Sequence, residues 1–208
     1  NWSWDFADGN VISGSEQGIH NDLYHIFNEA GTYDVVLTAS NGFESLSSAP
    51  TSVTVLASGS MENPAVQGFE AASYPSEDWY VIDQLNDGGW EMTEDASFSG
   101  TRSLKLANWG NDIEFNKDFL LSNTFDLSAA TEVRIEYKWA YCFKGNSEED
   151  DTDDRLRISV TGDCGNDWDL RKMHRGYTTL PSAPPHYYPW VPQSADEWNE
   201  FTLVRDQT

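Results

Sequence analysis

The densest group of residues that could carry chemistry is an acidic run at residues 147–154, Ser-Glu-Glu-Asp-Asp-Thr-Asp-Asp. Carboxylates are the oxygen ligands that hard cations such as Ca²⁺ prefer, but the run lacks the central glycine and closing glutamate of an EF-hand loop. Its six like charges repel one another, so we expect a solvated, mobile loop between strands. The alternative is a weak calcium site that orders the loop. Asp154 is the member expected to be structural because it begins the following strand.

Groups suited to catalysis are sparse. None of the four histidines (His20, His25, His174 and His186) lies in an H-E-x-x-H zinc motif, and no serine lies in a G-x-S-x-G motif. Acidic residues are so frequent that neighbouring carboxylates arise by chance, and a glycosidase acid–base pair cannot be inferred from them. We therefore expect no catalytic residue in this chain. If the parent protein is a secreted metalloprotease, its active site lies elsewhere.

Exposed aromatic rings are the remaining candidates for binding. Tyr187, Tyr188 and Trp190 follow His186 within a proline-rich stretch. Exposed aromatic side chains stack on sugar rings or anchor protein partners. The alternative, which we favour from the sequence, is a loop that folds its own rings over one end of the domain.

Charge excludes several partners. The chain has 12 Lys and Arg against 35 Asp and Glu, a formal net charge of -23. Such a surface repels nucleic-acid phosphate and anionic lipid, so neither is expected as a partner. It suits divalent cations, or simply solubility. No apolar run reaches the length of a membrane span, so we expect no membrane insertion.

Alternating polar and apolar residues predict an all-β chain with two tandem β-sandwich domains. The clearest strands contain Tyr33, Val35 and Leu37, residues 52–56, residues 133–141 and residues 156–160. A small, polar, proline-containing stretch predicts a linker. The expected domains are residues 1–57 and 66–208, joined by residues 58–65. The chain opens within a strand, which predicts missing opening strands, and its last strand is expected to continue past Thr208.

The first domain resembles a PKD (polycystic-kidney-disease) domain. Residues 4–9, Trp-Asp-Phe-Ala-Asp-Gly, are similar to its W-D-F-G-D-G motif, with Ala7 in place of glycine. Residues 25–35 match its H-x-Y-x-x-x-G-x-Y-x-V pattern, and residues 36–41 match its x-L-T-V-x-N pattern. The resemblance implies an Ig-like sandwich in which His25 is structural. Asp5 and Asp8 are expected to make turn hydrogen bonds rather than to bind a cation.

The second domain resembles a jelly-roll module of large secreted Bacteroidetes-type proteins. Residues 154–168 are similar to its D-x-L-x-V-x-x-S-x-D-C-G-x-x-W signature, and residues 99–106 to its S-G-x-x-S-L-x-L strand. Such modules accompany pappalysin-like metalloproteases and type IX-secreted surface adhesins, usually beside PKD repeats. The resemblance implies an accessory module that is secreted or held at the cell surface.

The resemblance also implies one calcium ion near the first strand of the module and the loop before residues 99–106. Carried over to this sequence, its candidate ligands are Glu70, Asp95, Ser97 and Gly100, with Asp112 as a weaker addition. Ser97 and Gly100 would contribute carbonyl oxygens. The alternative is that Glu70 and Asp95 are capping or surface acids.

The two cysteines, Cys142 and Cys164, flank the acidic loop. If the strands on either side of that loop are antiparallel neighbours, an oxidising compartment favours a disulfide between them. Closing such a loop stabilises the fold by roughly 3 kcal/mol in the chain-entropy model. Two free buried thiols are the alternative.

These expectations combine into a non-catalytic spacer and adhesion module of a larger secreted or cell-surface protein. Its expected partners are a glycan or a protein, together with other domains of the parent chain. Two alternatives stay open. The pair could be accessory domains of a secreted metalloprotease, or a structural stalk or filament subunit.

Overall fold

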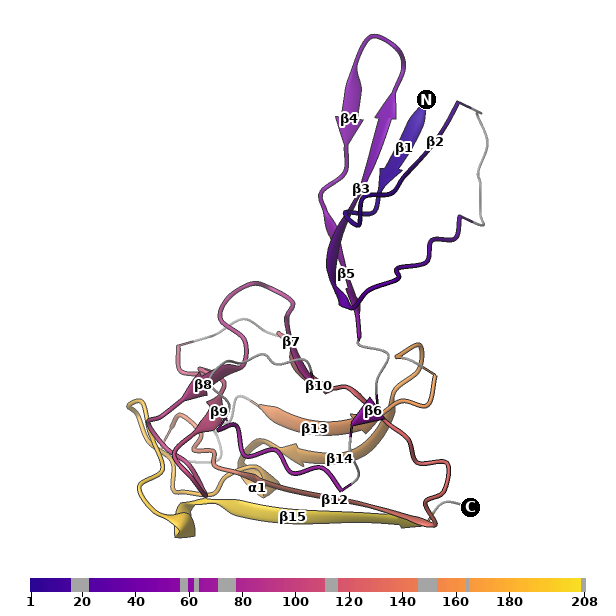
Figure 1. Ribbon diagram of the computed structural model, residues 1–208. Coiled ribbons are helices and arrows are strands. Elements are labelled where there is room, and N and C mark those ends of the chain that lie inside the picture. Colours follow the sequence, from indigo (N-terminus) through magenta and orange to yellow (C-terminus); the bar gives the residue numbers. More distant parts are fainter. Residues whose placement is uncertain are drawn as a thin grey trace. The chain divides into compact units, whose positions relative to one another are not determined.

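The computed structural model describes residues 1–15, 23–56, 60–61, 64–70, 78–110, 116–145, 153–163 and 165–206. It divides the chain into two compact units, Asn1–Met61 and Glu62–Thr208, at a point inside the segment 58–65 (Figure 1). Strands form most of the regular structure, which confirms the all-β prediction. In the described ranges, helical structure is limited to α1 (Gly176–Thr179) and the 3₁₀ turn η2 (Ala195–Glu197), and neither has the length and apolar character needed to cross a membrane.

The first unit is organised by a single antiparallel sheet. Its strands are β1 (Trp2–Asp5), β2 (Val11–Gly14), β3 (Gly31–Ser40), β4 (Ser45–Ser47) and β5 (Thr51–Val55). The order across the sheet is β2-β1-β3-β4, and β5 pairs with β3. A two-residue strand, β6 (Ser60–Met61), follows.

The long strand β3 pairs with three other strands. Its first half pairs with β5, so that Gly31 lies opposite Val55. Its second half pairs with β1, so that Ala39 lies opposite Trp2, and the same end also pairs with β4. The strands β1 and β5 therefore meet β3 at its opposite ends.

The core of the first unit is small and aromatic. Phe6 and Val35 are buried, and the ring of His25 stacks on Phe6 with 3.9 Å between ring centroids. Phe27 packs edge-on against His25 and stacks on Tyr33. The alternation predicted for β3 places Tyr33 and Val35 on this side.

The second unit consists of short antiparallel pairs. Its strands are β7 (Trp79–Asp83), β8 (Glu91–Thr93), β9 (Ser103–Lys105), β10 (Asp118–Ser122), β11 (Thr124–Phe125), β12 (Glu132–Trp139), β13 (Arg155–Val160), β14 (Asp169–Arg175) and β15 (Asn199–Asp206). Within this unit β7 pairs with β10, β8 with β9, β12 with β15, and β13 with β14. The predicted jelly-roll connectivity stays a prediction.

The main core of the second unit lies against β12. Tyr137 and Trp139 of β12 alternate with exposed residues, as the sequence pattern predicts. They pack around His174 of β14, which is only 3% exposed, and Phe201 of β15 closes the cluster. Contact with three aromatic rings explains why this histidine is buried on a strand with four charged residues.

One strand pairing that the sequence left open is not found among the described residues. The sequence left open whether the strands on either side of the acidic loop, β12 and β13, are antiparallel neighbours, but β12 pairs along its whole length with β15 and β13 pairs with β14. The loop between them therefore links two different pairs. The pairing of β12 with β15 spans eight residues, from Glu132 opposite Asp206 to Trp139 opposite Asn199.

Candidate functional site

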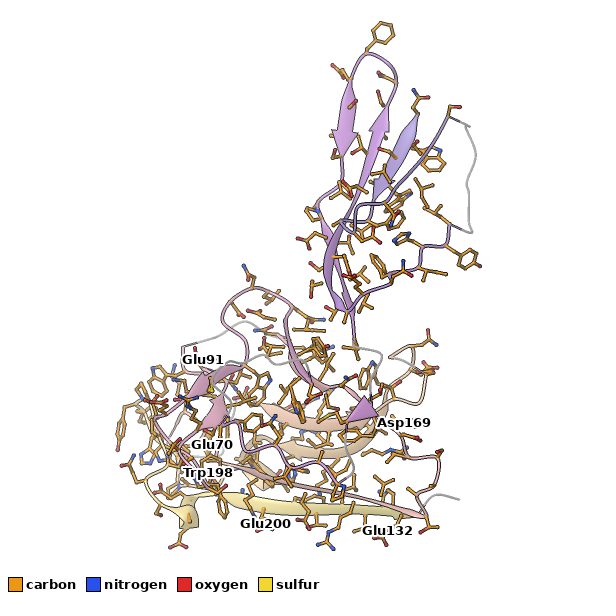
Figure 2. The ribbon with its side chains drawn as sticks, in the orientation of Figure 1. Glu70, Glu91, Glu132, Asp169, Trp198 and Glu200 are labelled. Atoms are coloured by element: carbon orange, nitrogen blue, oxygen red, sulfur yellow. The ribbon has the colours of Figure 1, made fainter. Side chains whose placement is uncertain are left out.

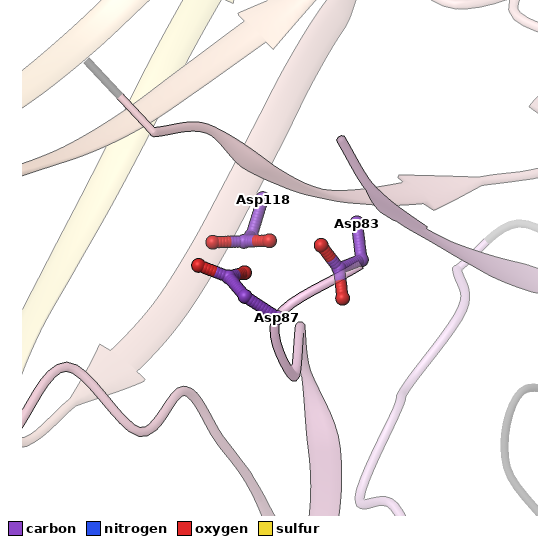
Figure 3. Close-up of side chains that lie close together, drawn as sticks. All are labelled: Asp83, Asp87 and Asp118. Carbon is purple, nitrogen blue, oxygen red and sulfur yellow. The ribbon is translucent and has the colours of Figure 1, made fainter. Parts of the chain in front are cut away.

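Three aspartates gather where β7 and β10 pair. Asp83 ends β7 and lies directly opposite Asp118, the first residue of β10. The turn that follows β7 brings Asp87 back toward them (Figure 3). Each residue offers a carboxylate oxygen, and these three oxygens all lie within 4.8 Å of one another. Among the described residues, this is the one group of three or more acidic, histidine or cysteine side chains close enough to share a metal ion.

Backbone donors hold Asp83 in place. Its Oδ2 accepts hydrogen bonds from the amides of Gly88 at 2.8 Å and Gly89 at 3.1 Å, and its Oδ1 accepts one from Leu85. The bonds from Gly88 and then Gly89 lower the pKa of Asp83 to about 2, so the group is ionised at neutral pH. A β-carbon at Gly89 would lie 2.9 Å from that of Asp83, so the close turn requires glycine there.

Asp118 has the opposite electrostatic environment. Burial raises the pKa of its carboxyl group, and the negative charges of Asp83 and Asp87 raise it further. The charge of Asp118 is therefore poorly solvated and faces two like charges. Either a proton on Asp118 or a nearby cation would relieve this repulsion.

The residues predicted to bind calcium surround a different loop. Glu70 accepts hydrogen bonds from the amides of Thr101 at 2.9 Å and Arg102 at 3.0 Å, and from the Thr101 hydroxyl at 2.8 Å. The Thr101 hydroxyl and then the two amides lower the pKa of Glu70. Gly100 has φ +70, and a β-carbon there would lie 2.2 Å from Oε1 of Glu70. Glu70 thus fastens its segment to the loop before β9, at the end of the unit where Trp198 lies (Figure 2).

The other predicted ligands are only partly brought together with Glu70. Ser97 donates its hydroxyl to the carbonyl of Gly100 at 3.1 Å. Asp95 pairs instead with Lys105 at 3.2 Å, and its backbone amide donates to the hydroxyl oxygen of Thr93 at 3.1 Å. Asp95 and Ser97 line a polar hollow of about 520 Å³ beside Trp198. Asp112 lies outside the described residues.

The predicted aromatic segment is tied to a neighbouring stretch of chain. The amide of His186 donates to Phe143, the amide of Gly145 donates back to His186, and Ser182 donates to Tyr141. Beyond this ladder the side chain of Tyr187 is 55% exposed and that of Tyr188 is 61% exposed. Tyr188 packs on the ring of His186, with 5.0 Å between centroids. Trp190, in contrast, is half-buried.

Cys142 lies beside the same segment. Its thiol donates to the carbonyl of Pro184 at 3.0 Å. Burial raises the pKa of this thiol, so it is a weak nucleophile. Cys164 lies outside the described residues, as do residues 146–152 of the acidic run, and the disulfide stays a prediction.

Asp153 and Asp154, the last two residues of the acidic run, make contacts that hold the fold together. Asp154 accepts the hydroxyl of Tyr141 at 2.6 Å, and its carbonyl accepts the amide of Gly176 at 2.8 Å. Asp153 accepts hydrogen bonds from the guanidinium groups of Arg155 and Arg175. The bonds from Arg155 and then Arg175 lower the pKa of Asp153 to about 2. These contacts fix the start of β13.

The motif residues of the first unit form a structural cluster. Asp5 and Asp8 cap the turn by accepting the amides of Ala7 and Asn10, as predicted. Asp8 also lies 2.7 Å from Nε2 of His25. Although burial raises the pKa of Asp8, the bonds with His25 and Asn10 hold it below its usual value. His20 lies outside the described residues.

Sequence reasoning missed the trio of Asp83, Asp87 and Asp118. A usable signal was present in residues 83–89, Asp-Gln-Leu-Asn-Asp-Gly-Gly, which place oxygen-bearing side chains and glycines directly after a strand. Asp118 carried no such signal, because only the register of β7 with β10 brings it to this turn.

Comparison with known proteins gives one result. The family model of the PKD domain matches residues 1–55. No significant match to the chain was found among curated proteins or solved structures. The match confirms the resemblance of residues 4–9 and 25–41 to PKD motifs, and PKD domains are non-catalytic modules typical of extracellular proteins. The first unit is therefore similar to a PKD domain.

Proposed function

We propose that this chain is a non-catalytic adhesion segment of a secreted or cell-surface protein. In this proposal the first unit is a spacer and the second unit contacts a glycan through Tyr187 and Tyr188. A parent protein exported by the type IX route would fit the resemblance of the second unit. Further domains of that parent would supply any enzymatic activity.

The proposal rests on one observation, which is that the rings of Tyr187 and Tyr188 are exposed on a backbone held in place by hydrogen bonds. Both rings are more than half exposed, yet the chain beside them is held by backbone hydrogen bonds to residues 141–145. A fixed backbone lowers the entropy lost when exposed rings are immobilised on a ligand. Exposed tyrosines stack on the apolar faces of sugars while their hydroxyl groups bond to sugar hydroxyls.

A binding assay on polysaccharides tests this role. The intact chain is passed over immobilised extracellular polysaccharides, beside a Tyr187→Ala/Tyr188→Ala double variant. Tyr24→Ala is the matched control, because Tyr24 is 81% exposed in the other unit. We expect the double variant to lose retention and the control to keep it. Equal retention of all three proteins would show that the aromatic surface is not the binding surface.

Calcium stabilisation at the Glu70 loop is a second part of the proposal. A carboxylate has about four lone-pair sites, and Glu70 uses three of them, so one remains for a cation. Ca²⁺ bound there would raise the unfolding midpoint by linkage. We expect the calcium-induced rise in the unfolding midpoint to be smaller in Glu70→Gln than in the unchanged protein, because the variant loses the cation bound at this loop. A calcium-induced rise of the same size in Glu70→Gln would leave Glu70 as a purely structural carboxylate.

The predicted disulfide belongs to the same proposal. A secreted protein would oxidise Cys142 and Cys164, and titration of free thiols in the unfolded chain would show none. Two reactive thiols in protein secreted by its native host would exclude the bond.

A further inference from the structure

We infer that Asp83, Asp87 and Asp118 form a calcium site, separate from the Glu70 loop. Ca²⁺ binds oxygen ligands at about 2.3–2.6 Å, so two oxygens on one ion lie at most about 4.6–5.2 Å apart. The three carboxylate oxygens lie within 4.8 Å of one another, inside that limit. Mg²⁺ binds at about 2.0–2.1 Å, which limits the separation to about 4.2 Å and requires near-octahedral geometry. Oxygens within 4.8 Å of one another are compatible with one bound Ca²⁺ ion.

Two buried oxygen atoms independently indicate a missing ligand. Oδ1 of Asp118 has less than 1 Å² of accessible surface and accepts no hydrogen bond within the described part of the chain, and the same holds for Oδ1 of Asn116. The amide nitrogen of Asn116 donates to both oxygens of Asp87, at 3.0 and 3.2 Å, so Asn116 borders the site. Buried polar atoms are almost always satisfied, and leaving one without a partner costs about 1–3 kcal/mol. The carboxylate of Asp118 faces that of Asp87 (Figure 3), which can accept but not donate a hydrogen bond, so a cation could bind both.

Charge at the site also favours a cation, because three carboxylate oxygens lie within 4.8 Å of one another. Backbone amides of Gly88 and Gly89 fix the carboxylate of Asp83, and the register of β7 with β10 places Asp118 directly opposite it. A divalent ion would reverse the repulsion on Asp118 and join β7, the following turn and β10 through one set of ligands. Water would complete the coordination shell, as it commonly does at calcium sites.

Terbium luminescence measures this site directly. Tb³⁺ is a hard oxygen-binding ion, and Trp90 lies close enough to sensitise it because its indole nitrogen donates to the carbonyl of Asp118 at 3.3 Å. The full chain is titrated with Tb³⁺ in salt at roughly 0.15 M, where exposed charges are largely screened. We expect sensitised emission that excess Ca²⁺ displaces.

Four variants locate the ion. Asp118→Asn and Asp87→Asn are expected to lose at least ten-fold in Tb³⁺ affinity. Asp126→Asn, which removes an acid that accepts the amide of Ser128, and Glu70→Gln are expected to retain it. Retention of emission in both Asp118→Asn and Asp87→Asn would overturn the inference. Loss in Glu70→Gln alone would overturn it too, while supporting the cation proposed for the Glu70 loop.

Thermal unfolding gives a second readout that a merely structural role would not produce. In chelator, Asp118→Asn is expected to raise the unfolding midpoint because it removes a buried charge that faces two others. With Ca²⁺ added, the unchanged protein is expected to gain several degrees and Asp118→Asn to gain less. A lower midpoint for Asp118→Asn in chelator, with an undiminished calcium response, would contradict the site.

Discussion

The hydroxyl of Tyr137 lies 2.7 Å from Nε2 of His174, inside a cluster of aromatic rings. Both side chains come from strands of the second unit that are not neighbours in sequence. Burial raises the pKa of Tyr137 to about 12, so its hydroxyl stays protonated and available to the histidine. The hydrogen bond supplies a polar partner for a histidine that is only 3% exposed.

Replacing Tyr137 with Phe is expected to destabilise the second unit by about 1–3 kcal/mol, because Nε2 of His174 would remain buried without a partner. Denaturant unfolding measures the change. Tyr177→Phe is the control, because Tyr177 is 38% exposed. A loss no larger than that of the control would show that His174 finds another partner.

The same pair predicts a loss of stability in mild acid. Burial lowers the pKa of His174 from 6.5, and the charge of Lys172 lowers it further, while a bond to the Thr179 backbone acts in the opposite direction. The unfolded state therefore binds a proton that the folded state resists. The stabilisation is complete above pH 6.5 and is lost as the pH falls toward the lower, folded-state pKa.

Unfolding midpoints measured between pH 8 and pH 5 test that slope. His174→Gln removes the titration, so its midpoint is expected to fall less over this range. The raised pKa of Asp118 acts in the opposite sense, and comparison with the variant separates the two effects. Parallel curves for the two proteins would exclude His174 as the titrating group.

A double-mutant cycle tests the Glu70 loop. Gly100→Ala places a β-carbon in a left-handed backbone conformation, which costs about 1–2 kcal/mol, and also against Glu70. In a Glu70→Ala background the steric part disappears and only the backbone part remains. We expect a coupling energy of about 0.5–3 kcal/mol from denaturant unfolding. Additive effects would show that the carboxylate does not press on this loop.

The backbone conformation of Ala7 predicts that glycine at this position would stabilise the first unit. Ala7 occupies the position of a family glycine and adopts φ 58, a left-handed conformation that alanine tolerates poorly. Ala7→Gly is expected to stabilise the first unit by about 0.5–1 kcal/mol. The control Ala39→Gly lies within β3 and is expected to destabilise by a similar amount. If both variants shifted the unfolding midpoint in the same direction, the backbone strain at Ala7 would be contradicted.

Local patterns predicted the strands well and their partners poorly. The alternation of Val133, Ile135 and Tyr137 is a property of neighbouring residues, and it correctly placed β12. Its pairing with β15 depends on residues sixty or more positions away, and no short pattern encodes that register. For the same reason the sequence left open whether β12 pairs with β13, and the structure pairs β13 with β14 instead.

The candidate sites also contain residues that a local pattern reveals and residues that only strand pairing brings together. Tyr187 and Tyr188 were visible as a local aromatic segment, and only the structure shows that their rings are exposed on an anchored chain. The turn of Asp83 and Asp87 was also local. Asp118 joins it through strand pairing, so the complete trio could not be assembled from the sequence.

The arrangement of β1 and β5 on β3 has a mechanical consequence. Trp2 lies opposite Ala39 and Val55 lies opposite Gly31, so tension applied through Asn1 and Val55 would slide β1 and β5 along β3 in opposite directions. Antiparallel ladder bonds run perpendicular to the strands, so such a load would shear them together instead of opening them one by one. The first unit would thus be loaded in shear geometry, and it would stay folded under pulling forces that would readily unzip a simple hairpin.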